Sequence, residues 1–317
     1  MTLKNISAPI TLDDQLKNMK LYVHFRKKSR MISFLSRTGY FRCSRYGKFL
    51  ISNAQVIGFK PSQDMLFHLY EFDTKLRELL FHYCQIAEIQ FKALLADSLS
   101  LKLNDAAYYL NQEYFTPSRS ERDKIKKQSN IRFFNIFYEN LLSTSIMLHK
   151  NGRKYPELSE YRKGGSKVTD KLPCWVFFSY VELGTITNIY AYLRGDLRIH
   201  VLKSGYSRKH YHKNTTKQFD TWLEALRNLR NVCAHHAILI SRTSSIVLPE
   251  TIDSHSLISD TDLFSRIYAL KKILPPSEHP QLKKDLQKLI KHSKIAVATL
   301  HILPADWDTR YDNISIL

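Results

Sequence analysis

Apolar residues recur every three or four positions along most of this chain, which is the period of an amphipathic α-helix. The clearest case is 62–97, where Ser62 is a good N-cap residue. The apolar seam that follows alternates intervals of four and three residues: Met65, Leu69, Phe72, Leu76, Leu79, Tyr83 and Ile86. The same period predicts helices from about Thr11, over 131–148, within 172–202, over 221–242, near 261–274 and over about 279–300. Because glycine is scarce and proline lies mostly between these segments, the chain is predicted to be all-α.

The pattern also suggests how the chain is divided. A more acidic stretch at 250–262 follows the motif-bearing segment 221–242 and precedes the last two predicted helices. We therefore expect a helical domain over 1–243 and a C-terminal helical extension over 244–317 that packs on the same core.

The segment 221–242, TWLEALRNLRNVCAHHAILISR, has the most informative polar positions. Thr221 followed three residues later by Glu224 is a capping box, which predicts that a helix begins here. One stripe of that helix is apolar and consists of Trp222, Leu226, Leu229, Cys233 and Ile240. The other face carries Glu224, Arg227, Asn231 and His235, with Arg230 beside them and Ile238 among them. A plain solvated face would be rich in Lys and Glu, so this face is predicted to contact a ligand or partner.

The net charge of the chain indicates which kind of molecule it could bind. Lys and Arg number 48 against 29 acidic residues, a net charge of +19, and such an excess attracts polyanions such as RNA or DNA. The segment 24–30 is a basic run, and two further segments, 37–46 and 203–219, combine cations with aromatic rings. Their candidate RNA-binding residues are Arg26, Lys27, Lys28, Arg42, Arg45, Lys203, Tyr206, Arg208, Lys209, His210, Tyr211 and Lys213. The alternatives are a basic surface kept for solubility, a helical corner packed by its aromatics at 37–46 and an ordinary charged loop at 203–219.

Several classes of protein are disfavoured. The four cysteines form no C-x-x-C pair, which indicates reduced thiols rather than a disulfide framework or zinc site. The N-terminus lacks an apolar leader, and no stretch approaches the roughly 18 apolar residues of a membrane span. We see no carboxylate cluster for magnesium. We therefore expect a cytoplasmic protein without membrane attachment, metal or cofactor.

The string LRNVCAHH at 229–236 resembles the Arg-polar-x-x-x-His motif of the HEPN ribonucleases. More narrowly, it is similar to the L-R-N-x-C-A-H-H segment of the bacterial Abi-like (AbiD/AbiF, abortive infection) proteins. Other strings agree with this resemblance: the Tyr/Arg-rich 37–46, FDTKLR at 72–77, LPCW at 172–175 and PADW at 304–307. Many such proteins continue x-R-L-W-N-R where 237–242 here read AILISR, which retains Arg242.

The resemblance implies a HEPN-like helical bundle with additional N- and C-terminal helices. It also implies a metal-independent RNA endonuclease that acts in phage defence or as a toxin. The expected catalytic residues are Arg230, Asn231 and His235. A homodimer would bring two motifs together, and the implied partners are the RNA substrate and a structured noncoding RNA that acts as an antitoxin. Supporting roles are expected for Arg227, His236, Glu182 and Arg242.

Further expectations concern single side chains. Glu182 is expected to be buried with Arg227 or Arg230 as its partner. The helical angle places His236 and Cys233 in the core. Asp73 and Arg77 are expected to form a weak surface ion pair. Two other functions stay open: a non-catalytic protein that sequesters a structured RNA, and a helical interaction protein in which the motif has no role.

Overall fold

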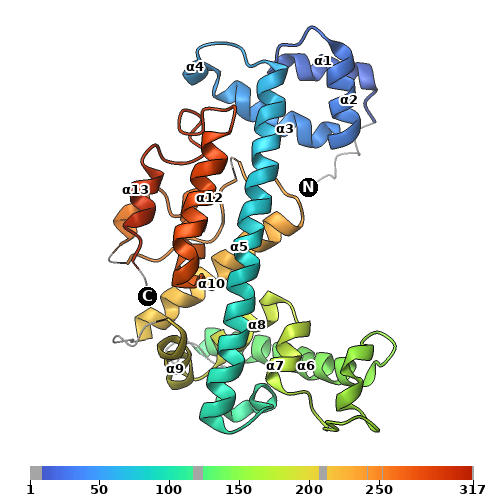
Figure 1. Cartoon of the computed structure of the whole chain (residues 1–317), viewed down its shortest axis with the longest axis vertical. Helices are drawn as coiled ribbons and strands as arrows, with labels where there is room; N and C mark the ends of the chain where they lie inside the picture. The colour runs from blue at the N-terminus through green and yellow to red at the C-terminus, as the bar shows by residue number, and fades with distance from the viewer. Residues whose placement is uncertain (1–8, 117–123, 207–212, 241, 252, 316–317) are drawn as a thin grey trace.

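The helix α5 (Gln63–Leu103) extends along most of the molecule in this computed structural model (Figure 1). The structure describes residues 9–116, 124–206, 213–240, 242–251 and 253–315, without the side chains of 124–130 and 213–214. As predicted, Ser62 caps the helix, because its hydroxyl accepts a hydrogen bond from the N–H of Met65 at 3.3 Å. With 41 residues, α5 is about 60 Å long. It is the element on which the other helices assemble.

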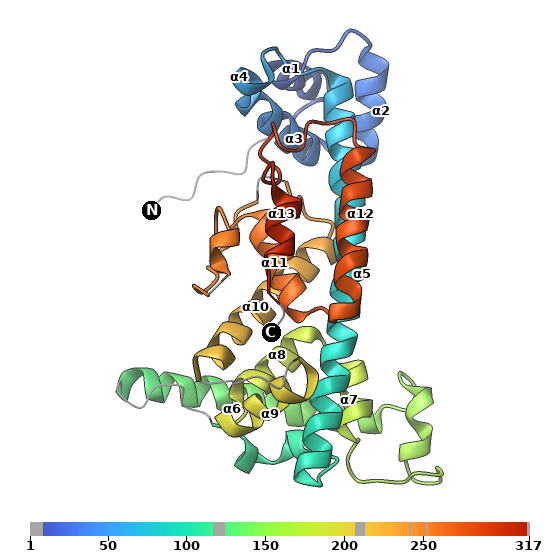
Figure 2. The ribbon, with the colours of Figure 1, turned by 60° about the vertical axis from the view of Figure 1, so that its left-hand side comes forward.

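Four helices surround the N-terminal end of α5 (Figures 1 and 2). They are α1 (Leu12–Tyr22), α2 (Lys28–Thr38), α3 (Tyr40–Ser52) and the short α4 (Ala54–Ile57). A single residue, Gly39, connects α2 to α3 with a φ of +78°, a conformation that glycine adopts without the cost a Cβ would add. On α3, a Cβ at Gly47 would lie 2.9 Å from the Cβ of Tyr22. The close contact between α1 and α3 therefore requires glycine at this position.

The opposite end of α5 carries α6 (Lys124–Lys150), α7 (Cys174–Tyr180), α8 (Leu183–Tyr192) and α9 (Gly195–Gly205). Short 3-10 segments connect them: η1 (Tyr108–Leu110), η2 (Gln112–Tyr114) and η3 (Pro156–Tyr161). Aromatic rings fill this part of the core, as where Tyr109 stacks on Phe177 with centroids 4.4 Å apart. The helix predicted over 131–148 is longer than expected at both ends.

The motif helix α10 (Lys213–Ala234) packs on both α5 and α11 (Leu263–Ile273), and every residue of α11 is buried. The chain then continues through η5 (Pro276–Glu278), α12 (His279–Lys291), which packs beside α5, and α13 (Trp307–Asp312). The helix α12 is shorter than the predicted 279–300. Past its end, the hydroxyl of Ser293 donates to the carbonyl of Ile290 at 2.7 Å and so competes with the helical pattern.

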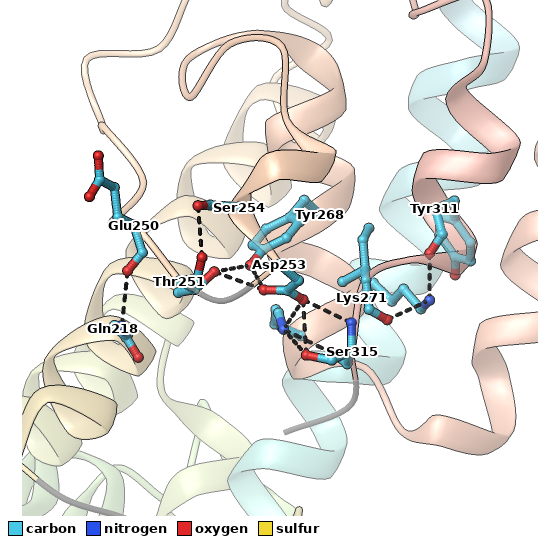
Figure 3. Close-up of polar contacts among 11 residues, drawn as sticks. Gln218, Glu250, Thr251, Asp253, Ser254, Tyr268, Lys271, Tyr311 and Ser315 are labelled. Atoms are coloured by element: carbon cyan, nitrogen blue, oxygen red, sulfur yellow. Dashed lines mark hydrogen bonds and ion pairs between the residues drawn. The ribbon is translucent and has the colours of Figure 1, made fainter.

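A buried carboxylate fixes the C-terminal part of the chain (Figure 3). Asp253, just before η4 (Ser254–Ser256), pairs with the ammonium of Lys272 at 2.6 Å and accepts hydrogen bonds from Tyr268 and the N–H of Ser315. Burial raises the pKa of this carboxyl, but Lys272 and the hydroxyls of Tyr268 and Thr251 outweigh burial and hold the pKa well below its usual range. The ion pair therefore fixes the end of the chain against α11.

The all-α prediction is confirmed. The described residues form α-helices, 3-10 helices and two isolated β-bridges, and they contain no strand. Among them, no helix is both long and apolar enough to cross a membrane. All four cysteines are free and buried. Burial raises the pKa of the Cys233 thiol to about 12, as expected for a core position.

Candidate functional site

The motif helix begins well before the position that the capping box predicts. α10 already includes Lys213, and the Thr221 hydroxyl donates to the carbonyl of Lys217 at 3.2 Å, as a residue inside a helix does. The prediction failed because the buried face of the helix extends upstream: Thr216 and Phe219 are buried at 3% and 0% exposure. Packing of these two residues extends the helix past the local capping signal.

The helix also ends earlier than the sequence predicts. The N–H of Ala237 donates to the carbonyl of Val232 at 3.0 Å, and the N–H of His236 to the carbonyl of Cys233 at 3.1 Å. With His236 at a φ of +53°, this is a Schellman cap. His236 is exposed, so its predicted place in the core is wrong. The helical angle used for that prediction does not apply past the last turn.

The three predicted catalytic residues lie together at this end of α10. The N–H of His235 donates to the carbonyl of Asn231 at 2.9 Å, which is the last α-helical hydrogen bond and places both side chains one turn apart on one face. Both residues are exposed. Arg230 is half-buried, and its Nη1 donates to Asn231 Oδ1 at 3.4 Å. A guanidinium, an amide and an imidazole therefore share one accessible helix end.

Arg230 is held by α5. Its Nε lies 3.3 Å from Glu88 Oε2, close enough for an ion pair although not aligned as a hydrogen bond, and its guanidinium lies 5.9 Å from the Phe81 ring centroid. Glu88 is only 8% exposed and also pairs with Lys92 at 2.8 Å. Two cations thus share one buried carboxylate, which orients the side chain of Arg230 beside Asn231.

The predicted partnership of Glu182 is wrong. Glu182 is exposed at the N-cap of α8, because the chain breaks into α7 and α8 at this point instead of continuing as one buried helix. Arg227 pairs instead with Glu224 on its own helix. Its guanidinium lies against Gly184, where a Cβ would be 3.6 Å from Nη1 of Arg227.

A buried network anchors the segment that follows the motif. Asp73 on α5 is 0% exposed, and its Oδ1 accepts the N–H groups of Leu239 and Ile240 at 3.1 and 3.0 Å. Its Oδ2 accepts the hydroxyl of Tyr46 at 2.5 Å and pairs with Arg77, which is 4% exposed. The predicted surface ion pair is therefore a buried one, and it connects α3, α5 and the chain after His235.

Sequence reasoning missed the role of Asp73, although one signal was present. Asp73 lies four residues after Leu69 and three before Leu76, so the apolar period itself places it on the buried stripe of α5. A carboxylate in that position needs donors. Two of those donors are backbone N–H groups far away in the sequence, which no local pattern identifies.

The candidate RNA-binding residues are spread over several places. Arg26, Lys27 and Lys28 are exposed just before and at the start of α2, and Lys203 is exposed on α9. The ring of Tyr206 packs on buried Phe219, with centroids 5.1 Å apart. Four candidates and one side chain lie outside the described residues: Arg208, Lys209, His210, Tyr211 and the side chain of Lys213.

Three predicted arginines come together beside the motif. Arg42 and Arg45 on α3, and Arg242 after α10, line one groove of about 500 Å³. Its remaining lining residues are Phe41, Ala237, Ile238, Ile240 and Thr243. The groove therefore joins the basic-aromatic segment 37–46 to the chain that leaves the motif.

The donor chemistry of the site is that of phosphate binding and proton transfer. In the described part of the chain, no group of three or more His, Cys, Asp or Glu side chains is placed to hold a metal ion. Comparison with curated proteins and with solved structures found no match. Residues 33–241, from α2 to the end of the motif segment, match the family described as Abi-like protein. Because this match covers more than half of the chain, the protein belongs to the Abi-like family.

Proposed function

We propose that this protein is a metal-independent RNA endonuclease of the HEPN type that acts in phage defence by abortive infection, or as a toxin. The observation that carries the proposal is the accessible cluster of Arg230, Asn231 and His235 at the end of α10. Membership of the Abi-like family supports the biological setting. The net charge of +19 favours a polyanionic substrate.

The chemistry needs only groups that the motif supplies. RNA carries its own nucleophile, the ribose 2′-hydroxyl. A base removes the 2′-proton, the 2′-oxygen attacks the phosphorus, and the 5′-oxygen leaves with a proton from an acid. The products are a 2′,3′-cyclic phosphate and a 5′-hydroxyl. Imidazole can serve as either the base or the acid near neutral pH, so His235 supplies one of these two groups.

Arg230 and Asn231 assist in binding. A guanidinium donates two parallel hydrogen bonds to phosphate oxygens and keeps its charge throughout, so Arg230 stabilises the charge that develops on the phosphorane. The ion pair with Glu88 orients this guanidinium. Asn231, one turn before His235, binds the imidazole or the ribose.

One chain supplies one motif imidazole, whereas the reaction needs both a base and an acid. We therefore propose a homodimer in which two motifs form one composite site with two arginines and two histidines. The half-buried Ile238, three residues after His235, is an apolar side chain suited to a self-complementary contact. A structured noncoding RNA is proposed as the partner that controls the activity.

Cleavage of RNA in EDTA tests the proposal. Wild type is expected to leave 2′,3′-cyclic phosphate and 5′-hydroxyl ends, while His235→Ala and Arg230→Ala abolish cutting. His235 is exposed, so its substitution leaves the fold intact, and thermal unfolding of each variant checks this. Equal cutting by wild type and His235→Ala would contradict the site assignment. Tight RNA binding without any cutting would favour the alternative, a protein that sequesters a structured RNA.

A further inference from the structure

The groove beside the motif has the chemistry of a site for a nucleic-acid strand. Its two sides carry Arg42 and Arg45 from α3 and Arg242 from the segment after α10, and none of its eight lining residues is acidic. Guanidinium groups on facing sides can hold successive phosphates of one strand. The groove is therefore electrostatically complementary to a phosphodiester backbone.

Phe41 adds a feature that phosphate binding alone does not explain. This side chain lines the groove and is 72% exposed, and the guanidinium of Arg45 lies 5.4 Å from its ring centroid. An accessible aromatic ring next to cations is the arrangement on which proteins stack unpaired bases. In a duplex the base faces are already stacked on each other, so this ring favours a single strand.

The two sides of the groove are held in place by one buried carboxylate. Asp73 accepts the hydroxyl of Tyr46, which follows Arg45 on α3. The same carboxylate accepts the N–H groups of Leu239 and Ile240, which belong to the opposite side. A shared buried anchor fixes the spacing of the two sides before any ligand binds, which reduces the ordering cost of binding.

The groove also adjoins the segment that follows the catalytic candidates in the chain. Ala237 lines it and is two residues after His235, so their Cα atoms are at most about 7 Å apart. We propose that this groove binds an unpaired RNA strand, with one base stacked on Phe41 and phosphates on Arg42, Arg45 and Arg242, and delivers the adjoining nucleotide to His235. The inference rests on the proposed function, because it takes RNA as the substrate.

Binding is measured on full-length protein carrying His235→Ala, so that no cutting interferes. Fluorescence anisotropy compares one labelled single-stranded RNA with the same sequence in a duplex. Phe41→Ala is expected to weaken single-strand affinity about 5- to 150-fold, the range for loss of one stacked base, and to leave duplex affinity unchanged. Phe41→Trp, which keeps a stacking ring, is expected to retain the affinity.

The chain offers a matched control residue for Phe41 and one for Arg45. Phe59 is also exposed, at 60%, but does not line the groove, so Phe59→Ala is expected to change nothing. Arg45→Ala is expected to lower the slope of log affinity against log salt concentration by about one. Its control is Arg153→Ala, because Arg153 is exposed but lies outside the groove. This control is expected to leave the slope unchanged. Equal effects of Phe41→Ala and Phe59→Ala, or equal losses for single and double strands, would overturn the inference.

Cleavage by protein with His235 intact separates this inference from the proposed function. If wild type cuts RNA and Phe41→Ala cuts with unchanged KM, the groove assignment is wrong while the endonuclease stands. If no RNA is cut but single-strand binding still depends on Phe41, the endonuclease is wrong while the groove stands.

Discussion

Replacing Asp73 by asparagine tests the buried network on which the segment after the motif depends. Asparagine keeps the shape and an oxygen that can accept the N–H groups of Leu239 and Ile240. Its amide nitrogen, however, replaces the oxygen to which Tyr46 and Arg77 donate. The guanidinium of Arg77 would then face another donor, Tyr46 could no longer donate to this position, and the negative charge would be lost.

The size of the effect follows from burial. Arg77 is 4% exposed, and removing one partner of a buried ion pair strands the other charge at a cost of about 3–5 kcal/mol. We expect Asp73→Asn to lower the free energy of unfolding by this amount, a large part of the roughly 5–15 kcal/mol that folded proteins have. Urea unfolding followed by far-ultraviolet circular dichroism measures the change.

Two further variants isolate the cause. Glu71 and Lys75 form an ion pair of 2.7 Å on the same helix, but both are exposed, so Glu71→Gln is expected to cost less than about 0.5 kcal/mol. Combining Asp73→Asn with Arg77→Met removes the stranded charge and should recover part of the lost stability. A loss below about 1 kcal/mol for Asp73→Asn, or strict additivity in the double variant, would refute the reasoning.

Other predictions follow from single side chains. With its pKa raised to about 12, Cys233 should resist iodoacetamide at pH 8 in the native protein and react once unfolded, as mass spectrometry can show. Burial lowers the pKa of Lys271 from 10.5 to about 8, so the unfolded chain binds more protons between these values. The contribution of Lys271 to stability should therefore rise with pH from about 8 to 10.5, and in denaturation series the stability of wild type relative to Lys271→Met should rise over the same range. A Cβ at Gly205 would lie 2.1 Å from Leu94 Cδ2, so Gly205→Ala should cost about 1–3 kcal/mol in urea unfolding, partly recovered when Leu94→Ala makes room. His236→Gly should keep the proposed RNA cleavage and leave stability within about 1 kcal/mol, because glycine suits the left-handed cap; loss of cutting with an intact fold would give His236 a role in the proposed reaction.

Local signals in the sequence predicted those parts of the fold that depend on neighbouring residues. The Ser62 cap and the period of 3–4 residues were sufficient for α5, and the helical angle placed Asn231 and His235 on one face. These features need only residues within one or two turns of each other, which is why a single sequence reveals them.

The features that the sequence did not predict depend on contacts between segments that are far apart in the chain. The start of α10 is set by the burial of Thr216 and Phe219 rather than by the capping box at Thr221. The groove exists because Asp73 joins α3 to residues more than 160 positions away along the chain. No periodicity identifies such partners, because the fold alone brings them together.

The length of α5 has a consequence for the size of the RNA that the proposed function would require. The helix α3 meets α5 at Asp73, whereas α9, which carries Lys203, meets it at Leu94 and Ser98. At 1.5 Å per residue these contact points are roughly 35 Å apart along a rigid helix. If the protein binds RNA as proposed, an RNA too short to span this distance can reach the groove or α9 but not both, and affinity should increase in a step once the RNA is long enough to reach both.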